Sequence, residues 1–178
     1  MITDGFVLPE KDMPFDKRFD LNGCLLAFHS FLRNYHLGGK SFDLFFKGEC
    51  VTYNVNPRIV LPFLQMGAGL LSRKQEPNAG ILKRAMRLPW QWEWDRRGLE
   101  RQLPDAMRLF RISYDMADLQ EPVQLKDAVL IAKTKVSFAV LSYLGELGQS
   151  GYPDSGAFQY VRLFNQLGRF VRNYGVGG

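Results

Sequence analysis

The sequence is poor in cysteine and histidine, with two of each among its 178 residues. Cys24 and Cys50 are each followed by an apolar residue, and a chain of this size can bury roughly 70% of its unfolded surface without a disulfide. We therefore expect two reduced, buried thiols that act as small apolar side chains. The spacing of these cysteines and of His29 and His36 matches no zinc pattern, so neither a metal nor another cofactor is predicted.

The sequence also lacks the motifs of known catalytic sites. Ser150 is without the glycine pattern of a nucleophile elbow, and Gly39-Lys40-Ser41 is without the upstream glycine of a phosphate-binding loop. No arrangement of Cys, His or carboxylate residues supplies a nucleophile, a base and an oxyanion stabiliser together. The sequence therefore predicts that the protein is not an enzyme.

Long hydrophobic runs and a secretory leader are missing too. The longest apolar stretch, residues 136–147, is interrupted by Ser137, Ser142, Gly145 and Glu146 and falls short of the ~20 residues that span a bilayer. The first twenty residues carry acidic side chains and no apolar core, which is unlike a signal peptide. We expect an intracellular protein without a transmembrane segment, in the cytoplasm, in the nucleus, or within a particle assembled there.

Aromatic side chains, in contrast, are abundant: they make up 13% of the chain and include 14 Phe residues. Together with 46% apolar and 23% charged residues, this composition is typical of a folded globular protein. We predict an N-terminal arm or edge element over residues 1–20, where Pro9 and Pro14 disfavour a helix. The length then fits one compact domain over residues 21–178.

Hydrophobic spacing predicts an α+β fold that is mostly helical, with a small antiparallel hairpin or sheet. Helices are expected over residues 22–36, 62–72, 79–88, 96–102, 104–112, 123–147 and 157–174. Alternating apolar residues on both sides of Lys47-Gly48-Glu49 predict an antiparallel β-hairpin over residues 41–55. For residues 135–140, β-branched side chains leave a strand as the alternative.

Residues 90–94 alternate tryptophan with polar side chains. Trp90, Trp92 and Trp94 would share one face of a strand, because successive side chains of a strand point to opposite faces. Such a strand could pair with the predicted hairpin. The three rings fit the core or a subunit interface, and they also fit a platform on which nucleic-acid bases stack, so these alternatives remain open.

Positive charge is in excess, with a formal net charge of +5 at pH 7, and it is unevenly distributed. Basic residues gather between positions 73 and 111, and positions 156–178 hold arginines and no acidic residue. Basic side chains at such density can neutralise phosphates. The predicted nucleic-acid or anion-binding residues are Lys83, Arg84, Arg87, Arg96, Arg97, Arg101, Arg162, Arg169 and Arg172.

The segment 157–174 gives the clearest amphipathic pattern in the chain. At 100° per residue, its large apolar side chains fall within an arc of about 120°, and its arginines fall on the opposite side. The apolar positions are Tyr160, Leu163, Phe164, Leu167, Phe170, Val171 and Tyr174. We expect this face to dock on the rest of the domain, although a basic amphipathic helix can also lie on a membrane surface.

Two functional interpretations follow from these patterns. The first is a non-enzymatic protein that binds RNA or DNA through its Arg/Lys surface. The second is a structural protein that self-assembles into an oligomer through aromatic residues and the N-terminal arm, with peripheral contact to a membrane or a nucleocapsid. Small basic viral matrix or shell proteins have this general character, which is an analogy of class and names no family. The sequence does not identify the ligand.

Overall fold

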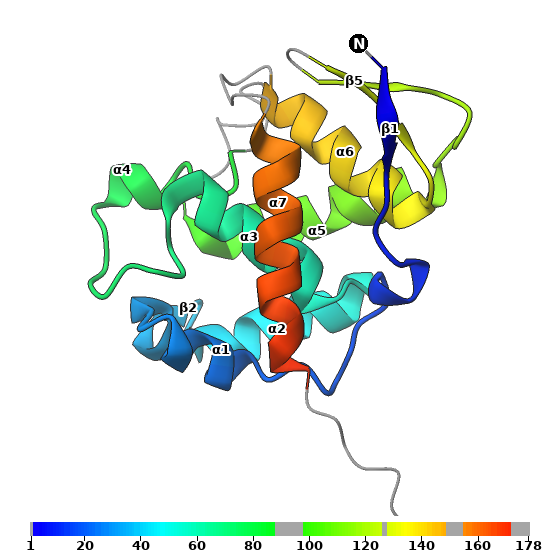
Figure 1. The fold of residues 1–178 in the computed structure, drawn as a ribbon. Coiled ribbons are helices and arrows are strands. Elements are labelled where there is room, and N and C mark those ends of the chain that lie inside the picture. Colours follow the sequence, from blue (N-terminus) through cyan, green and yellow to red (C-terminus); the bar gives the residue numbers. More distant parts are fainter. Residues whose placement is uncertain (1, 88–97, 126–127, 149–154, 172–178) are drawn as a thin grey trace, which may run out of the picture.

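The structure is a computed structural model that describes residues 2–87, 98–125, 128–148 and 155–171 (Figure 1). The α+β, mostly helical fold is confirmed. The helices are α1 (Leu21–Ala27), α2 (Phe42–Tyr53), α3 (Pro57–Ala68), α4 (Ala79–Leu82), α5 (Leu99–Asp115), α6 (Lys135–Gly148) and α7 (Ser155–Leu167). Short 3-10 helices are η1 (Glu10–Asp12), η2 (Phe31–Asn34) and η4 (Gly168–Phe170).

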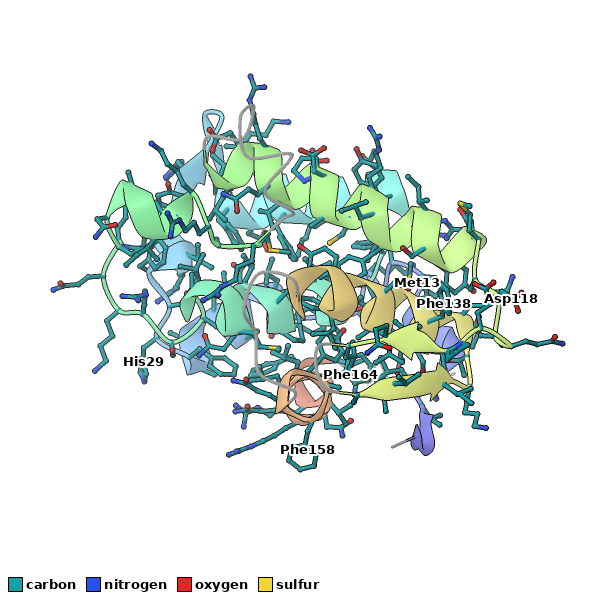
Figure 2. The ribbon with its side chains drawn as sticks, turned by 90° about the horizontal axis from the view of Figure 1, so that it is seen from above. Met13, His29, Asp118, Phe138, Phe158 and Phe164 are labelled. Atoms are coloured by element: carbon teal, nitrogen blue, oxygen red, sulfur yellow. The ribbon has the colours of Figure 1, made fainter. Side chains whose placement is uncertain are left out.

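Helices α3, α5, α6 and α7 form three layers. Seen from above, α5 lies on one side, α3 and α6 lie in the middle, and α7 lies on the opposite side (Figure 2). Phe63 of α3 joins them, because its ring contacts one ring from each of the other helices. Its centroid is 5.1 Å from that of Phe110 in α5, 4.6 Å from that of Tyr143 in α6 and 4.8 Å from that of Tyr160 in α7. Such tilted and edge-to-face pairs stabilise a core beyond their buried area.

A three-stranded sheet holds the N-terminal segment on the body. Its order is β1 (Ile2–Phe6), β5 (Val129–Ala132) and β4 (Val123–Gln124), with β1 parallel and β4 antiparallel to β5. Leu8 then bonds to the start of α6: its N–H donates to Ser137 Oγ at 2.7 Å, and its carbonyl accepts from Thr134 Oγ1 at 2.8 Å. Residues 2–6 of the N-terminal segment thus form an edge strand of this sheet.

The β-hairpin predicted over residues 41–55 is wrong, because these residues form α2. Ser41 caps the helix, with its Oγ accepting from the N–H of Leu44, and Asn54 ends it in the left-handed conformation. Phe42, Phe46 and Cys50 are buried. This i, i+4, i+8 spacing is helical, and the neighbouring apolar residues on the exposed side had given it the look of an alternating strand.

A two-stranded antiparallel hairpin lies immediately before α2. It pairs β2 (His36–Leu37) with β3 (Lys40–Ser41). Gly38 and Gly39 form its turn, both with positive φ angles (55° and 80°), as two-residue hairpin turns require. The prediction of a small antiparallel element was therefore correct in kind and wrong in position.

Several predicted helices begin or end elsewhere. Residues 96–102 and 104–112 belong to one helix where they are described, since Pro104 lies inside α5. The predicted helix over 123–147 divides into β4, β5 and α6, so the strand alternative for 135–140 is wrong. α3 begins at Pro57 behind the cap Asn56, five residues before Pro62. The predicted strand over residues 90–94 lies outside the described residues.

Two predictions about burial are confirmed. Cys24 and Cys50 are free, buried thiols. Burial raises the pKa of Cys24 to about 12, against the attraction of Arg169, and raises the pKa of Cys50 well above its ordinary value. α7 docks its apolar face on the body through Tyr160 and Phe164, which are buried. In the part of the chain that the structure describes, no helix is both long and apolar enough to cross a membrane.

Candidate nucleic-acid interface

Two arginines of the basic segment donate hydrogen bonds to the C-terminal end of α3. Arg73 Nε donates to the carbonyl of Ala68 at 2.9 Å, and Arg87 Nε donates to the carbonyl of Gly67 at 3.1 Å. Carbonyls in the last turn of a helix have no partner within it, and they carry the negative end of the helix dipole. Arg87, predicted as an anion-binding residue, therefore has a structural role at this helix end.

The backbone that follows α4 is held by buried hydrogen bonds. Gln102 of α5 is buried; its Nε2 donates to the carbonyl of Leu82 at 2.7 Å, and its Oε1 accepts from the N–H of Met86 at 3.0 Å. Tyr143 Oη donates to the carbonyl of Met86 at 2.7 Å. The start of α4 is capped by Asn78, whose Oδ1 accepts from the N–H of Ile81 at 3.1 Å. These bonds fix the backbone at Leu82 and Met86 against α5 and α6.

Lys83 and Arg84 lie between these two fixed residues and are exposed to solvent. Arg101, next to Gln102 on α5, is exposed as well. Among the described residues, none of these three side chains has a hydrogen-bonding or ion-pairing partner. The Lys83–Arg84 turn and the start of α5 are separated in the sequence by the tryptophan-rich segment. The structure brings them together, since Gln102 bonds to Leu82. We call Lys83, Arg84 and Arg101 the α4–α5 cations.

The other predicted arginines that the structure describes lie on α7 and η4. Arg162 and Arg169 are exposed, on the side opposite to the buried Tyr160 and Phe164, as predicted. Arg169 is held by two rings: its guanidinium carbon lies 4.8 Å from the centroid of Phe170 and 6.0 Å from that of Phe28. This geometry is a cation–π contact, which orients the guanidinium while leaving its N–H groups accessible.

Phe158 is a residue that the sequence reasoning missed. Its side chain is 79% exposed on the first turns of α7, and it points away from the body while Phe164 points into it (Figure 2). Its position outside the apolar arc, four residues before Arg162, was the available signal. An exposed aromatic ring one turn from an arginine is an arrangement that can stack on a base and neutralise a phosphate.

Arg58 is a half-buried cation that holds α7 in place. Its Nη1 pairs with Asp12 Oδ2 at 3.2 Å, its Nε donates to the carbonyl of Phe164 at 2.8 Å, and its guanidinium carbon lies 3.8 Å from the centre of the Phe164 ring. Burial lowers the pKa of Arg58, and the nearby Asp12 opposes that shift. Arg58 thus links the N-terminal segment, α3 and α7, and it belongs to the framework of the protein.

Several predicted site residues cannot be placed in this arrangement. Arg96, Arg97, Arg172, Trp90, Trp92 and Trp94 lie outside the described residues. Within the described ranges, no group of three His, Cys, Asp or Glu residues could hold a metal ion.

Comparisons of the chain with known protein families, with curated proteins and with solved structures find no match. What the protein binds is therefore inferred from its own residues.

Proposed function

We propose that the protein is a non-enzymatic nucleic-acid-binding protein that acts on RNA or DNA inside the cell. The observation that carries this proposal is the set of exposed α4–α5 cations on a backbone fixed by Gln102. A cation on a rigid support loses less conformational freedom when it neutralises a phosphate than one on a mobile loop. The unpaired thiols of Cys24 and Cys50 fit a reducing compartment such as the cytoplasm or nucleus.

A charge reversal at the turn after α4 tests the proposal. The variant carries Lys83→Glu and Arg84→Glu, and it should bind a labelled generic RNA or DNA at least tenfold more weakly in fluorescence anisotropy at low salt. Because both side chains are exposed, its thermal unfolding by circular dichroism should stay close to that of the wild type.

The matched control carries Lys17→Glu and Lys133→Glu, two exposed lysines distant in sequence from the α4–α5 cations. Both double variants lower the net charge equally, so the comparison separates the position of the charge from its total. The proposal is overturned if the wild type binds neither RNA nor DNA at low salt, or if the control weakens binding as much as the Lys83/Arg84 variant does.

A second candidate function is self-assembly, and exposed apolar side chains favour it. Ile112, Met116 and Leu119, at i, i+4 and i+7 around the end of α5, are all exposed, with Met116 at 76%. Exposed apolar patches occur at protein or membrane contacts. Sedimentation velocity should then show oligomers that grow with concentration and are lost on Met116→Lys. Pelleting with acidic liposomes would instead indicate peripheral membrane contact.

A further inference from the structure

We infer that the solvent-facing side of α7 is a binding site for single-stranded nucleic acid, in which Phe158 stacks on a base while Arg162 and Arg169 neutralise phosphates. This inference rests on the proposed function and adds the strand type and the contact residues. Phe158, Arg162 and Asn165 follow one another at i, i+4 and i+7, and Arg169 comes four residues later in η4. All four side chains are exposed. We call them the α7 strip.

Folding alone gives no reason for the position of Phe158. α7 is already anchored by the buried rings of Tyr160 and Phe164 on its other side. Single exposed apolar residues are common on protein surfaces, so exposure by itself would mean little. Here the exposed ring shares one narrow strip with two arginines and an amide. This combination fits a nucleic-acid strand, since the ring can stack on a base and the cations can neutralise phosphates.

The charged side chains of the α7 strip, Arg162 and Arg169, are both cations and so complement a polyanion. The sequence has no acidic residue from position 155 to the end. Two carboxylates have partners inside the protein: Asp12 is paired with Arg58, and Asp20 caps α1 by accepting from the N–H of Gly23 at 3.0 Å. A membrane-bound helix would instead turn a continuous apolar face outward, whereas the outward face of α7 has one ring among polar and basic side chains.

Arg169 is preorganised for such a contact. Its guanidinium lies near the rings of Phe28 and Phe170, which restrict its conformations. The side chain of Arg169 is exposed, so N–H donors of its guanidinium remain open to a ligand. A phosphate can therefore bind at its edge without the entropy cost of ordering a free side chain.

The size and shape of the α7 strip favour a single strand over a duplex. At a rise of 1.5 Å per residue, Phe158 and Arg169 are separated by about 16 Å along the helix, which matches roughly five nucleotides of a stacked strand at ~3.4 Å each. In a duplex the base faces are covered by their neighbours, so a protruding phenyl ring finds no partner. In a single strand a base can leave the stack and lie on the ring.

The experiment measures anisotropy of labelled U12, dT12 and a 12-base-pair duplex with Phe158→Ala, Phe158→Tyr and the wild type. We expect Phe158→Ala to weaken binding of the single strands roughly tenfold and to leave duplex binding unchanged, because one base–ring contact is lost. Phe158→Tyr should restore the affinity, since its ring can stack. Comparison of U12 with dT12 shows whether RNA or DNA is preferred.

The matched control is Gln159→Ala, which changes an exposed neighbour on a different side of the same helix. The inference is contradicted if Phe158→Ala binds U12 and dT12 as well as Gln159→Ala does, or if it weakens duplex binding equally. In either of those cases the α4–α5 cations still account for binding, and the proposed function stands. If the wild type binds no strand at low salt, the proposed function and this inference both fail.

Discussion

Arg58, Arg73 and Arg87 show that a basic residue in this chain can have its principal contact inside the protein. Each donates through Nε to a main-chain carbonyl near a helix end: Phe164 in α7, Ala68 in α3 and Gly67 in α3. The sequence alone does not distinguish these arginines from the other cations. An arginine whose guanidinium caps a helix and one that binds phosphate are the same residue type. Arg87 differs in role from Lys83 and Arg84 only because it packs against the end of α3.

Gly67 allows the close approach on which the Arg87 contact depends. A Cβ at this position would lie 1.9 Å from the carbonyl oxygen of Ala85. We therefore expect Gly67→Ala to lower the free energy of unfolding by at least ~2 kcal/mol, although alanine is normally the better helix former. Urea unfolding followed by circular dichroism measures the change.

Gly48 provides the control for Gly67. It lies inside α2, is exposed, and has open space where a Cβ would stand. Gly48→Ala should raise the free energy of unfolding by roughly 0.5–1 kcal/mol through helix propensity. Equal effects of the two substitutions would show that residues 67 and 85 are not in close contact.

At the scale of elements, Gln102 is the link between α4 and α5. Its buried amide bonds to the carbonyl of Leu82 and the N–H of Met86 on one side. On the other side it donates to the carbonyl of Gly98 at 3.2 Å. These backbone groups lie on both sides of residues 88–97 in the chain. Gln102 therefore sets the positions of Lys83, Arg84 and Arg101 relative to one another.

Replacing Gln102 with leucine should leave the buried N–H of Met86 and the carbonyl of Leu82 without that partner. We expect the free energy of unfolding to fall by roughly 2–4 kcal/mol. Gln120→Leu, at an exposed position, should change it by less than ~0.5 kcal/mol. If Gln102→Leu unfolds at the same urea concentration as the wild type, the amide does not make these bonds.

Elements could be predicted from the sequence where one face of a helix is apolar and the other is not. α7 satisfies this condition and was predicted with its docking face. α2 was mistaken for a hairpin because Leu44, Phe45 and Val51 interrupt the contrast between its faces; Leu44 and Val51 are exposed despite being apolar. The buried amide of Gln102 has no sequence signal, since its partners are backbone groups of a distant segment.

At the scale of the whole molecule, one hydrophobic cluster extends from Leu8 to Leu167. Its centre is Phe63, where α3, α5, α6 and α7 meet. The N-terminal segment and α7 are joined to this core through Arg58 and Asp12. The α4–α5 cations and the α7 strip are therefore carried by the same packed framework, which favours a binding surface that is formed before the ligand arrives.

The most direct test of the nucleic-acid proposal is the salt dependence of binding to a single-stranded 20-mer between 50 and 300 mM KCl. Lys83, Arg84, Arg101, Arg162 and Arg169 would release counterions from five phosphates, so log K should fall against log[KCl] with a slope of roughly −3.5. A slope near zero, or no binding at 50 mM KCl, would contradict the account.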